Sequence, residues 1–150
     1  MKQFEPRHVA FEERIRSSFA LQRVMSTIGA RLLSVTPGTV EIELDFREDL
    51  TQQDGYLHAG ITTAIIDSAC GYAALSLLPL DSGVLTVEFK VNLVAPARGS
   101  RFLATGRVIK PGRTLTLCSG EVNAIEAGKD PVLVAVMQTT MIRLAISRAD

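Results

Sequence analysis

Apolar residues recur along the chain with two different periods, and the change of period marks the expected elements. From about Phe11 to Thr27, apolar residues keep helical spacing among Glu and Arg side chains, which predicts an amphipathic helix. From Val40 to Phe46 every second residue is apolar, and the same period returns from Leu85 to Leu93. This alternation is typical of strands with one buried face.

Between these strands lies a long run of small and apolar residues, GITTAIIDSACGYAALSLL, from Gly60 to Leu78. Its length approaches that of a membrane span, but Asp67 at its middle and several hydroxyl residues oppose insertion into lipid. A helix that is apolar nearly all round is instead covered by other parts of a protein. The run therefore predicts one long buried helix that contains a single carboxylate.

The remaining segments complete an antiparallel sheet. The turn at Pro37-Gly38 separates two expected strands, a hairpin is expected from 101–109 and 114–122, and a last strand from 132–144. The economical architecture is α+β, a curved antiparallel sheet of about six strands wrapped around one long central helix. We expect a single domain over residues 1–150, with an N-terminal helix at about 9–27 and a core at about 28–144. One helix covers only part of such a sheet, so pairing between sheet edges of two copies is expected.

Composition and charge exclude several classes of protein. The 150 residues are 47% hydrophobic and 21% charged, with 16 basic and 16 acidic side chains. No broad basic field exists to attract nucleic acid or an anionic membrane, so neither is an expected partner. Cys70 and Cys118 lack metal-ligand spacing and suit two buried reduced thiols. The N-terminus has no apolar signal core, and a cytoplasmic location is expected.

Three segments together resemble a known family. LHAGITTAIIDSACGYAA, LTVEFKVNLVAPARG and GRVIKPGRTL are similar to the hotdog-fold thioesterases of the phenylacetate-degradation (PaaI) type, over roughly residues 50–144. The central motif is a His, two small residues, and an acidic residue nine positions after the His. The resemblance implies a hotdog fold and hydrolysis of aryl or medium-chain acyl-CoA thioesters. It also implies a homodimer or a dimer of dimers (homotetramer), with no metal and no cofactor beyond the coenzyme A of the substrate.

The resemblance also assigns roles to residues around the start of the helix. Asp67 matches the family's carboxylate, which acts as general base or nucleophile, and burial should raise the pKa of Asp67. The helix begins at Ala59 and Gly60, where unpaired N–H groups and the helix dipole suit a developing oxyanion. The family uses the N–H of the residue after the His, here Ala59, at a position where Gly is usual. His58 is expected to orient this loop or the substrate.

Three more positions follow from the resemblance. Gln52 stands where the family carries an Asn or Gln that helps to bind the thioester carbonyl. Thr86 stands where the family has a hydroxyl that steadies the attacking water, although strand parity places it on one face with Glu88 and Lys90. Coenzyme A requires local cations because the net charge is zero. Arg113, in the Gly-Arg-Thr segment of the hairpin, is the first candidate, and the other candidates near the same hairpin are Arg98, Arg101 and Lys110.

Helix geometry makes a separate argument for a shared site. Seven residues separate Gly60 from Asp67, which is roughly 10 Å of helix rise. One thioester carbon cannot touch the helix N-terminus and Asp67 of the same chain. The N-terminus of one helix and Asp67 of a neighbouring copy could meet across a two-fold axis, so a catalytic dimer is expected.

Two other functions remain open at this point. A hotdog dehydratase pairs a His with a carboxylate, which His58 and Asp67 could imitate, although the longer His loop of dehydratases is missing. A non-catalytic module could bind acyl-CoA without hydrolysing it. Such a module would have no need of Asp67 in its helix. A serine hydrolase is disfavoured because no G-x-S-x-G elbow occurs.

Overall fold

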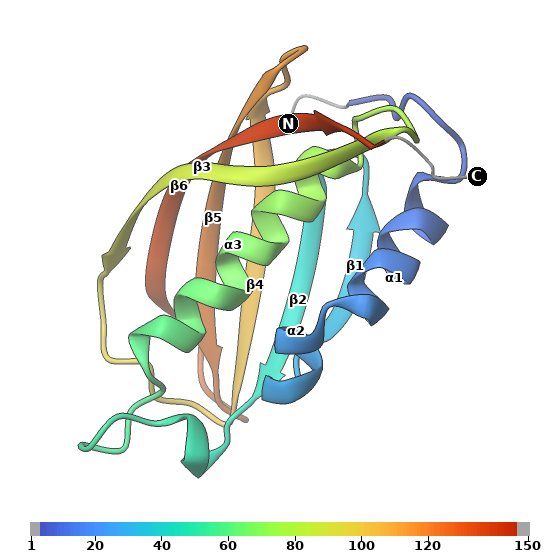
Figure 1. The fold of residues 1–150 in the computed structure, drawn as a ribbon. Coiled ribbons are helices and arrows are strands. Elements are labelled where there is room, and N and C mark those ends of the chain that lie inside the picture. The colour runs from blue at the N-terminus through green and yellow to red at the C-terminus, as the bar shows by residue number, and fades with distance from the viewer. Residues whose placement is uncertain (1–3, 147–150) are drawn as a thin grey trace.

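The computed structural model describes residues 4–146 and contains a six-stranded sheet with three α-helices (Figure 1). The described chain runs through α1 (Phe11–Leu21), α2 (Arg23–Ile28), β1 (Arg31–Thr36), β2 (Thr39–Asp45), a short 3-10 turn (Glu48–Leu50), α3 (Ala59–Leu75), β3 (Ser82–Leu93), β4 (Arg101–Lys110), β5 (Leu115–Ile125) and β6 (Val132–Ala145).

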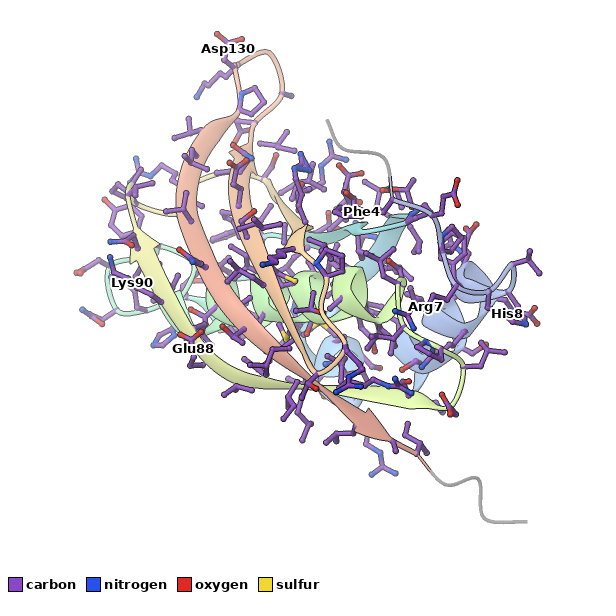
Figure 2. The ribbon with its side chains drawn as sticks, turned by 90° about the horizontal axis from the view of Figure 1, so that it is seen from above. Phe4, Arg7, His8, Glu88, Lys90 and Asp130 are labelled. Carbon is purple, nitrogen blue, oxygen red and sulfur yellow. The ribbon has the colours of Figure 1, made fainter. Side chains whose placement is uncertain are left out.

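The sheet is antiparallel throughout, with the order β1-β2-β4-β5-β6-β3. It curves around α3, which crosses its concave side (Figure 1), and the view from above in Figure 2 shows α3 within that curve. The prediction of an α+β hotdog architecture with about six strands is confirmed. The two edge strands are β1 and β3. Strand β1 comes directly after α2 in the chain, and β3 comes after α3. No helix within residues 4–146 is both long enough and apolar enough to cross a membrane.

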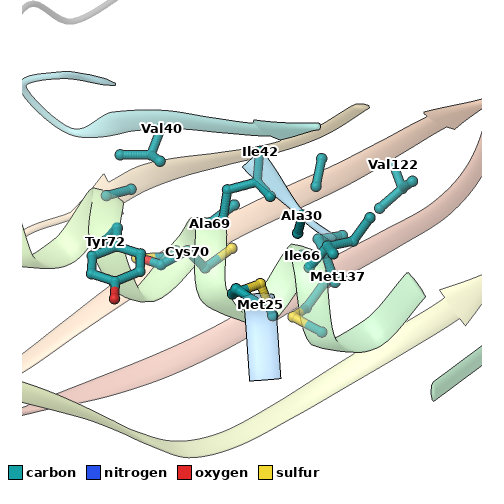
Figure 3. Packing of buried hydrophobic residues seen from close by; sticks show 14 of the residues in the cluster. Met25, Ala30, Val40, Ile42, Ile66, Ala69, Cys70, Tyr72, Val122 and Met137 are labelled. Atoms are coloured by element: carbon teal, nitrogen blue, oxygen red, sulfur yellow. The ribbon is translucent and has the colours of Figure 1, made fainter. Parts of the chain in front are cut away.

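Close contact between α3 and the sheet depends on two paired glycines. Gly106 of β4 lies opposite Gly120 of β5, and a Cβ at Gly106 would stand only 2.3 Å from the main-chain carbon of Ala69. A Cβ at Gly120 would stand 2.6 Å from a side-chain carbon of Ile66. Around this contact, apolar side chains of α3 and the sheet pack into a single buried cluster (Figure 3). The two glycines of the sheet therefore let α3 approach it closely.

The N-terminal segment forms two helices where the sequence predicts one. The break lies at Gln22, whose backbone is extended (φ −79°, ψ 95°) between α1 and α2. The Gln22 side chain donates to Ser68 Oγ of α3 at 3.1 Å, while Met25 and Ile28 of α2 are buried in the core. The change of direction allows both contacts, and helical periodicity alone could not predict it.

Candidate active site

Asp67 projects from the middle of α3 and is half-buried. Its Oδ1 accepts a hydrogen bond from the Thr86 hydroxyl of β3 at 2.8 Å. Desolvation raises the pKa of Asp67 above its usual value, and the Thr86 hydrogen bond partly opposes this shift. The second carboxylate oxygen, Oδ2, accepts no hydrogen bond from any residue in the range 4–146. Asp67 therefore has one anchored oxygen and one oxygen that is available to a proton or a water.

A bulge in β3 corrects the expectation from strand parity for Thr86. Thr86 pairs with the buried Met141 of β6, whereas Glu88 pairs with Thr140, and the register shifts at the intervening Val87. The shift turns Thr86 towards α3 and leaves Glu88 on the other face. Glu88 and Lys90 are labelled along the sheet edge in Figure 2. The bulge therefore brings the Thr86 hydroxyl to Asp67.

Asp67 lies in a cavity of about 500 Å³, which we call the Asp67 cavity. Most of the residues that line it belong to α1, α3, β3 and β6, and Gln22 lies between the two N-terminal helices. The lining residues are Arg14, Ser18, Gln22, Asp67, Ser68, Gly71, Tyr72, Leu75, Leu80, Ser82, Gly83, Val84, Leu85, Thr86, Met141 and Ile146. The polar N-terminal members were not predicted, although Arg14, Ser18 and Gln22 recur every fourth residue, which is a readable polar stripe of a helix.

His58 caps the N-terminus of α3. Its Nδ1 accepts the Gly60 N–H at 2.8 Å, and its carbonyl accepts the N–H groups of Ile61 and Thr62. The ring therefore accepts a hydrogen bond at Nδ1, a contact that fixes the ring against the start of α3. Of the first four N–H groups of α3, those of residues 59–62, only the N–H of Ala59 has no hydrogen-bond partner within residues 4–146.

The Ala at position 59 fits this geometry. Ala59 is the first residue of α3, and no residue other than Gly has a positive φ in the part of the chain that the structure describes. A Gly is therefore not required at this position. The backbone donor that the family resemblance assigns to Ala59 is present, and no group among residues 4–146 accepts its hydrogen bond.

Gln52 organises the loop that precedes α3. Its Oε1 accepts the N–H groups of Asp54 and Tyr56, and its Nε2 donates to Asp54 at 3.1 Å. Gln52 and Ala59 together line a second cavity of about 460 Å³, which we call the Gln52 cavity. Its remaining lining residues are Tyr56, Leu57, Thr62, Leu93, Val94, Ala95, Pro96, Ala97 and Val134.

The two cavities of one chain have no lining residue in common. The structure thus brings Asp67 together with Thr86, and Gln52 together with Ala59, but it keeps the two pairs apart. A carboxylate and an oxyanion donor that act on one carbonyl would both have to touch it. Within one chain they do not face the same cavity.

The cations proposed for phosphate binding are dispersed. Arg113 lines a third, smaller cavity with Arg7 and the residues that follow α3, and it lies in neither cavity described above. Arg101 is paired with Glu43 at 3.1 Å. Arg98 lies over the Tyr56 ring, 5.2 Å from its centroid, beside the Gln52 cavity.

Comparison with known proteins identifies the family. The model of the thioesterase superfamily matches residues 54–129, which contain the start of α3, Asp67 and Thr86. The chain belongs to the thioesterase superfamily. Human acyl-coenzyme A thioesterase 13 is 30% identical over 111 residues, which cover 72% of this chain and 76% of that protein. Two provisionally named esterases of Saccharolobus solfataricus are 30% and 28% identical, and the chain spans 63% and 66% of their lengths.

Solved structures agree with this superfamily assignment. A thioesterase family protein from Silicibacter pomeroyi has a TM-score of 0.88 and 47% identity, with 90% of this chain and 98% of that chain covered. The PaaI protein of the E. coli phenylacetic acid degradation operon has a TM-score of 0.79 with 91% and 96% coverage, but its 14% identity shows the fold alone. The resemblance seen in the sequence is therefore confirmed for the superfamily and the hotdog fold.

Proposed function

We propose that this thioesterase-superfamily protein hydrolyses acyl-CoA thioesters of the aryl or medium-chain class, as a homodimer that builds each active site from two chains. Membership of the superfamily supports the reaction. The observation that carries the shared site is the separation of Asp67 and the free Ala59 N–H into two cavities with no common residue. The PaaI type is the finer grouping that the motif around His58 favours.

In this proposal Asp67 is the general base. Its unbonded Oδ2 takes a proton from water while the water oxygen attacks the thioester carbon, and Thr86 keeps the carboxylate oriented through Oδ1. The Ala59 N–H of the partner chain donates to the oxygen that becomes negative. Collapse of the intermediate breaks the C–S bond. The coenzyme A sulfur leaves as a thiol after it receives the proton that Asp67 took from the water. The products are a carboxylic acid and coenzyme A.

The β3 edge supports the dimer. Residues 85–90 of this twelve-residue edge strand are all exposed and include the apolar Leu85, Val87 and Phe89. A long, exposed, apolar edge is prone to pair with another strand. The other edge strand, β1, has six residues and is packed by α1. Pairing of β3 with a second β3 would bring Thr86 and Asp67 close to the two-fold axis. A dimer of dimers remains compatible with this arrangement.

A complementation experiment tests the shared site. Asp67→Asn removes the base, and Ala59→Pro removes the donor at the first helical position, where Pro is well tolerated. His58 already has the extended backbone that precedes Pro readily (φ −62°, ψ 137°). Each variant alone should be nearly inactive. Co-expressed chains should form hybrid dimers with one intact site, which recovers about one quarter of the wild-type sites.

The outcome separates the possibilities. Ala59→Gly keeps the N–H and should keep activity, so it controls for the change of side chain. If each site lies within one chain, no hybrid contains an intact site and co-expression recovers nothing. Wild-type protein that binds acyl-CoA but hydrolyses none would be a binding module. His58 Nδ1 already accepts the Gly60 N–H, which disfavours a dehydratase that would use this nitrogen as its base.

A further inference from the structure

The bulge in β3 is held by three consecutive residues of β6. The Thr139 hydroxyl donates to the main-chain carbonyl of Glu88 at 2.9 Å, and the Thr140 hydroxyl donates to the Glu88 carboxylate. The Thr86 hydroxyl lies 3.4 Å from Met141 Sδ. The residues on both sides of the bulge are therefore held from β6.

Thr139 is a polar exception in an apolar layer. Every second residue of β6 from Ala135 to Met141 is buried, and all of these residues except Thr139 are apolar. Thr139 has an exposed fraction of 0% and pairs with the buried Cys118 of β5. A hydroxyl in such a place is unfavourable unless it is hydrogen-bonded, whereas a Val of similar shape would carry no such cost. Packing alone therefore does not explain a Thr at this position.

The position of Thr86 depends on the bulge. In a regular strand Thr86 and Glu88 would share one face, because side chains alternate with a period of two. The extra residue reverses the alternation, so that Thr86 reaches Asp67 at 2.8 Å while Glu88 stays on the other face. Bulges beside active sites re-aim side chains in this way.

The bulge lies in a strand that is supported on one side only. Within one chain β3 is an edge strand and pairs with β6 alone. A carbonyl oxygen has two lone pairs, so the Thr139 hydroxyl can bind the Glu88 carbonyl in addition to a main-chain N–H. Loss of the hydroxyl would leave the residue that follows the bulge less firmly held.

We propose that Thr139 is a positioning residue of the active site, whose hydroxyl holds the β3 bulge so that Thr86 reaches Asp67. This inference rests on the proposed function, because it takes Asp67 as the base that Thr86 orients. Thr139 lines neither the Asp67 cavity nor the Gln52 cavity, so it acts only through β3. A misplacement of about 1 Å at a reacting group can cost about 10²-fold in rate.

Thr139→Val tests the role of the hydroxyl. We expect kcat to fall by about 10- to 100-fold, with KM close to the wild-type value because no lining residue of either cavity changes. Thr139→Ser keeps the hydroxyl and should retain most of the activity. Thr105→Val, which removes a buried hydroxyl from β4, should keep the wild-type rate. Thr139→Ala replaces the Val variant if that variant does not fold.

The pH profile gives a readout that a purely structural role would not move. The hydrogen bond from Thr86 lowers the pKa of Asp67, so weakening it should raise that pKa. The fall of kcat/KM in acid should therefore move to higher pH in Thr139→Val and not in Thr139→Ser. The other titratable side chains that line the Asp67 cavity are Arg14 and Tyr72, which keep their protons in this pH range.

A double-mutant cycle tests whether Thr139 acts through Thr86. If it does, adding Thr139→Val to Thr86→Val should change kcat by less than about twofold, because the contact with Asp67 is already lost. Sedimentation of each variant at the assay concentration shows whether the oligomer is unchanged.

Three results would overturn the inference while wild-type hydrolysis stands. The first is a folded Thr139→Val variant with the wild-type kcat and pH profile. The second is a double variant in which the two losses multiply. The third is a loss of activity in Thr139→Val that only follows dissociation of the oligomer. A wild-type protein that hydrolyses no acyl-CoA would instead contradict the proposed function itself.

Discussion

At the scale of single residues, Asp67 has the environment expected of a base rather than of a structural ion. It has no cationic partner among the ion pairs of residues 4–146, and its single side-chain hydrogen bond comes from Thr86. An ionised carboxylate in a half-buried site without a cation is unfavourable, so its presence there has a cost in stability. Such costs are commonly found at functional sites.

Asp67→Asn should abolish the base and preserve the fold. We expect turnover to fall by about 10²–10⁴-fold, the range that general-base catalysis supplies. The variant should still bind acyl-CoA, because the amide keeps the size of the side chain. Thiol release and acyl-CoA binding, measured on both proteins, check this. Wild-type turnover in the variant would contradict the role of Asp67.

The raised pKa of Asp67 also predicts how stability depends on pH. The folded state binds the Asp67 proton more tightly than the unfolded state, so protonated Asp67 adds stability below its unfolded pKa. That contribution is lost as the pH rises through the higher folded pKa. Asp67→Asn should therefore unfold at higher denaturant concentration than wild type at pH 7, and the difference should shrink in acid.

A matched variant should lack this gain in stability. Asp49 is exposed, and its ion pair with Arg47 lowers its pKa, so Asp49→Asn should give no gain in stability at pH 7. For the wild type, kcat/KM should fall in acid as Asp67 becomes protonated, and the midpoint of this fall should lie above the pH range usual for an Asp side chain. A wild type as stable as Asp67→Asn at pH 7 would argue against a desolvated carboxylate.

At the scale of elements, the contact between α3 and the sheet allows no added atom at Gly106. The clash is with the main chain of Ala69, which cannot move aside as a flexible side chain could. Gly106→Ala should destabilise the fold by at least about 1–3 kcal/mol, the cost of overpacking a core.

Gly71→Ala is the control within α3. Its added Cβ would meet nothing nearer than Met141 Cε at 4.0 Å, and Ala is favoured over Gly in a helix by about 1 kcal/mol. Denaturant titration should therefore move in opposite directions for the two variants. Equal stability of Gly106→Ala and wild type would mean that α3 lies farther from the sheet.

The β4–β5 hairpin carries a separate test for coenzyme A. If Arg113 holds a phosphate, Arg113→Ala should raise KM for acyl-CoA and spare an acyl-pantetheine thioester, which lacks the nucleotide. Arg98→Ala is the informative comparison, because Arg98 lies beside the Gln52 cavity and Arg113 does not. If KM for acyl-CoA rises only in the Arg98 variant, the phosphate site lies at Tyr56 and Arg98 instead of at Arg113.

The spacing of apolar residues predicted the helices and strands because burial of one face of an element sets that spacing. The long helix was predictable because it is apolar nearly all round. The spacing could not predict the bulge at Val87 or the break at Gln22. Both depend on contacts with distant segments: Thr86 meets α3, and Gln22 meets Ser68. The cap by His58 was equally hidden, because His is not a usual helix cap.

At the scale of the whole molecule, the two edges of the sheet offer a matched pair of positions. Val87 of β3 and Leu33 of β1 both lie at register shifts, and their exposed fractions are 54% and 50%. If two copies pair through β3, only the first position is close to a second chain.

Val87→Asp should therefore place two like charges near the two-fold axis and weaken the dimer, whereas Leu33→Asp should leave it intact. We expect Val87→Asp to approach the mass of one 16.2 kDa chain in sedimentation and to lose activity in parallel. Activity should return as protein concentration rises, because association restores the shared site. If Leu33→Asp dissociates instead, the dimer uses the β1 edge, and the arrangement of Asp67 against the partner's Ala59 would be wrong. A wild-type protein that is fully active at the mass of one chain would refute the shared site altogether.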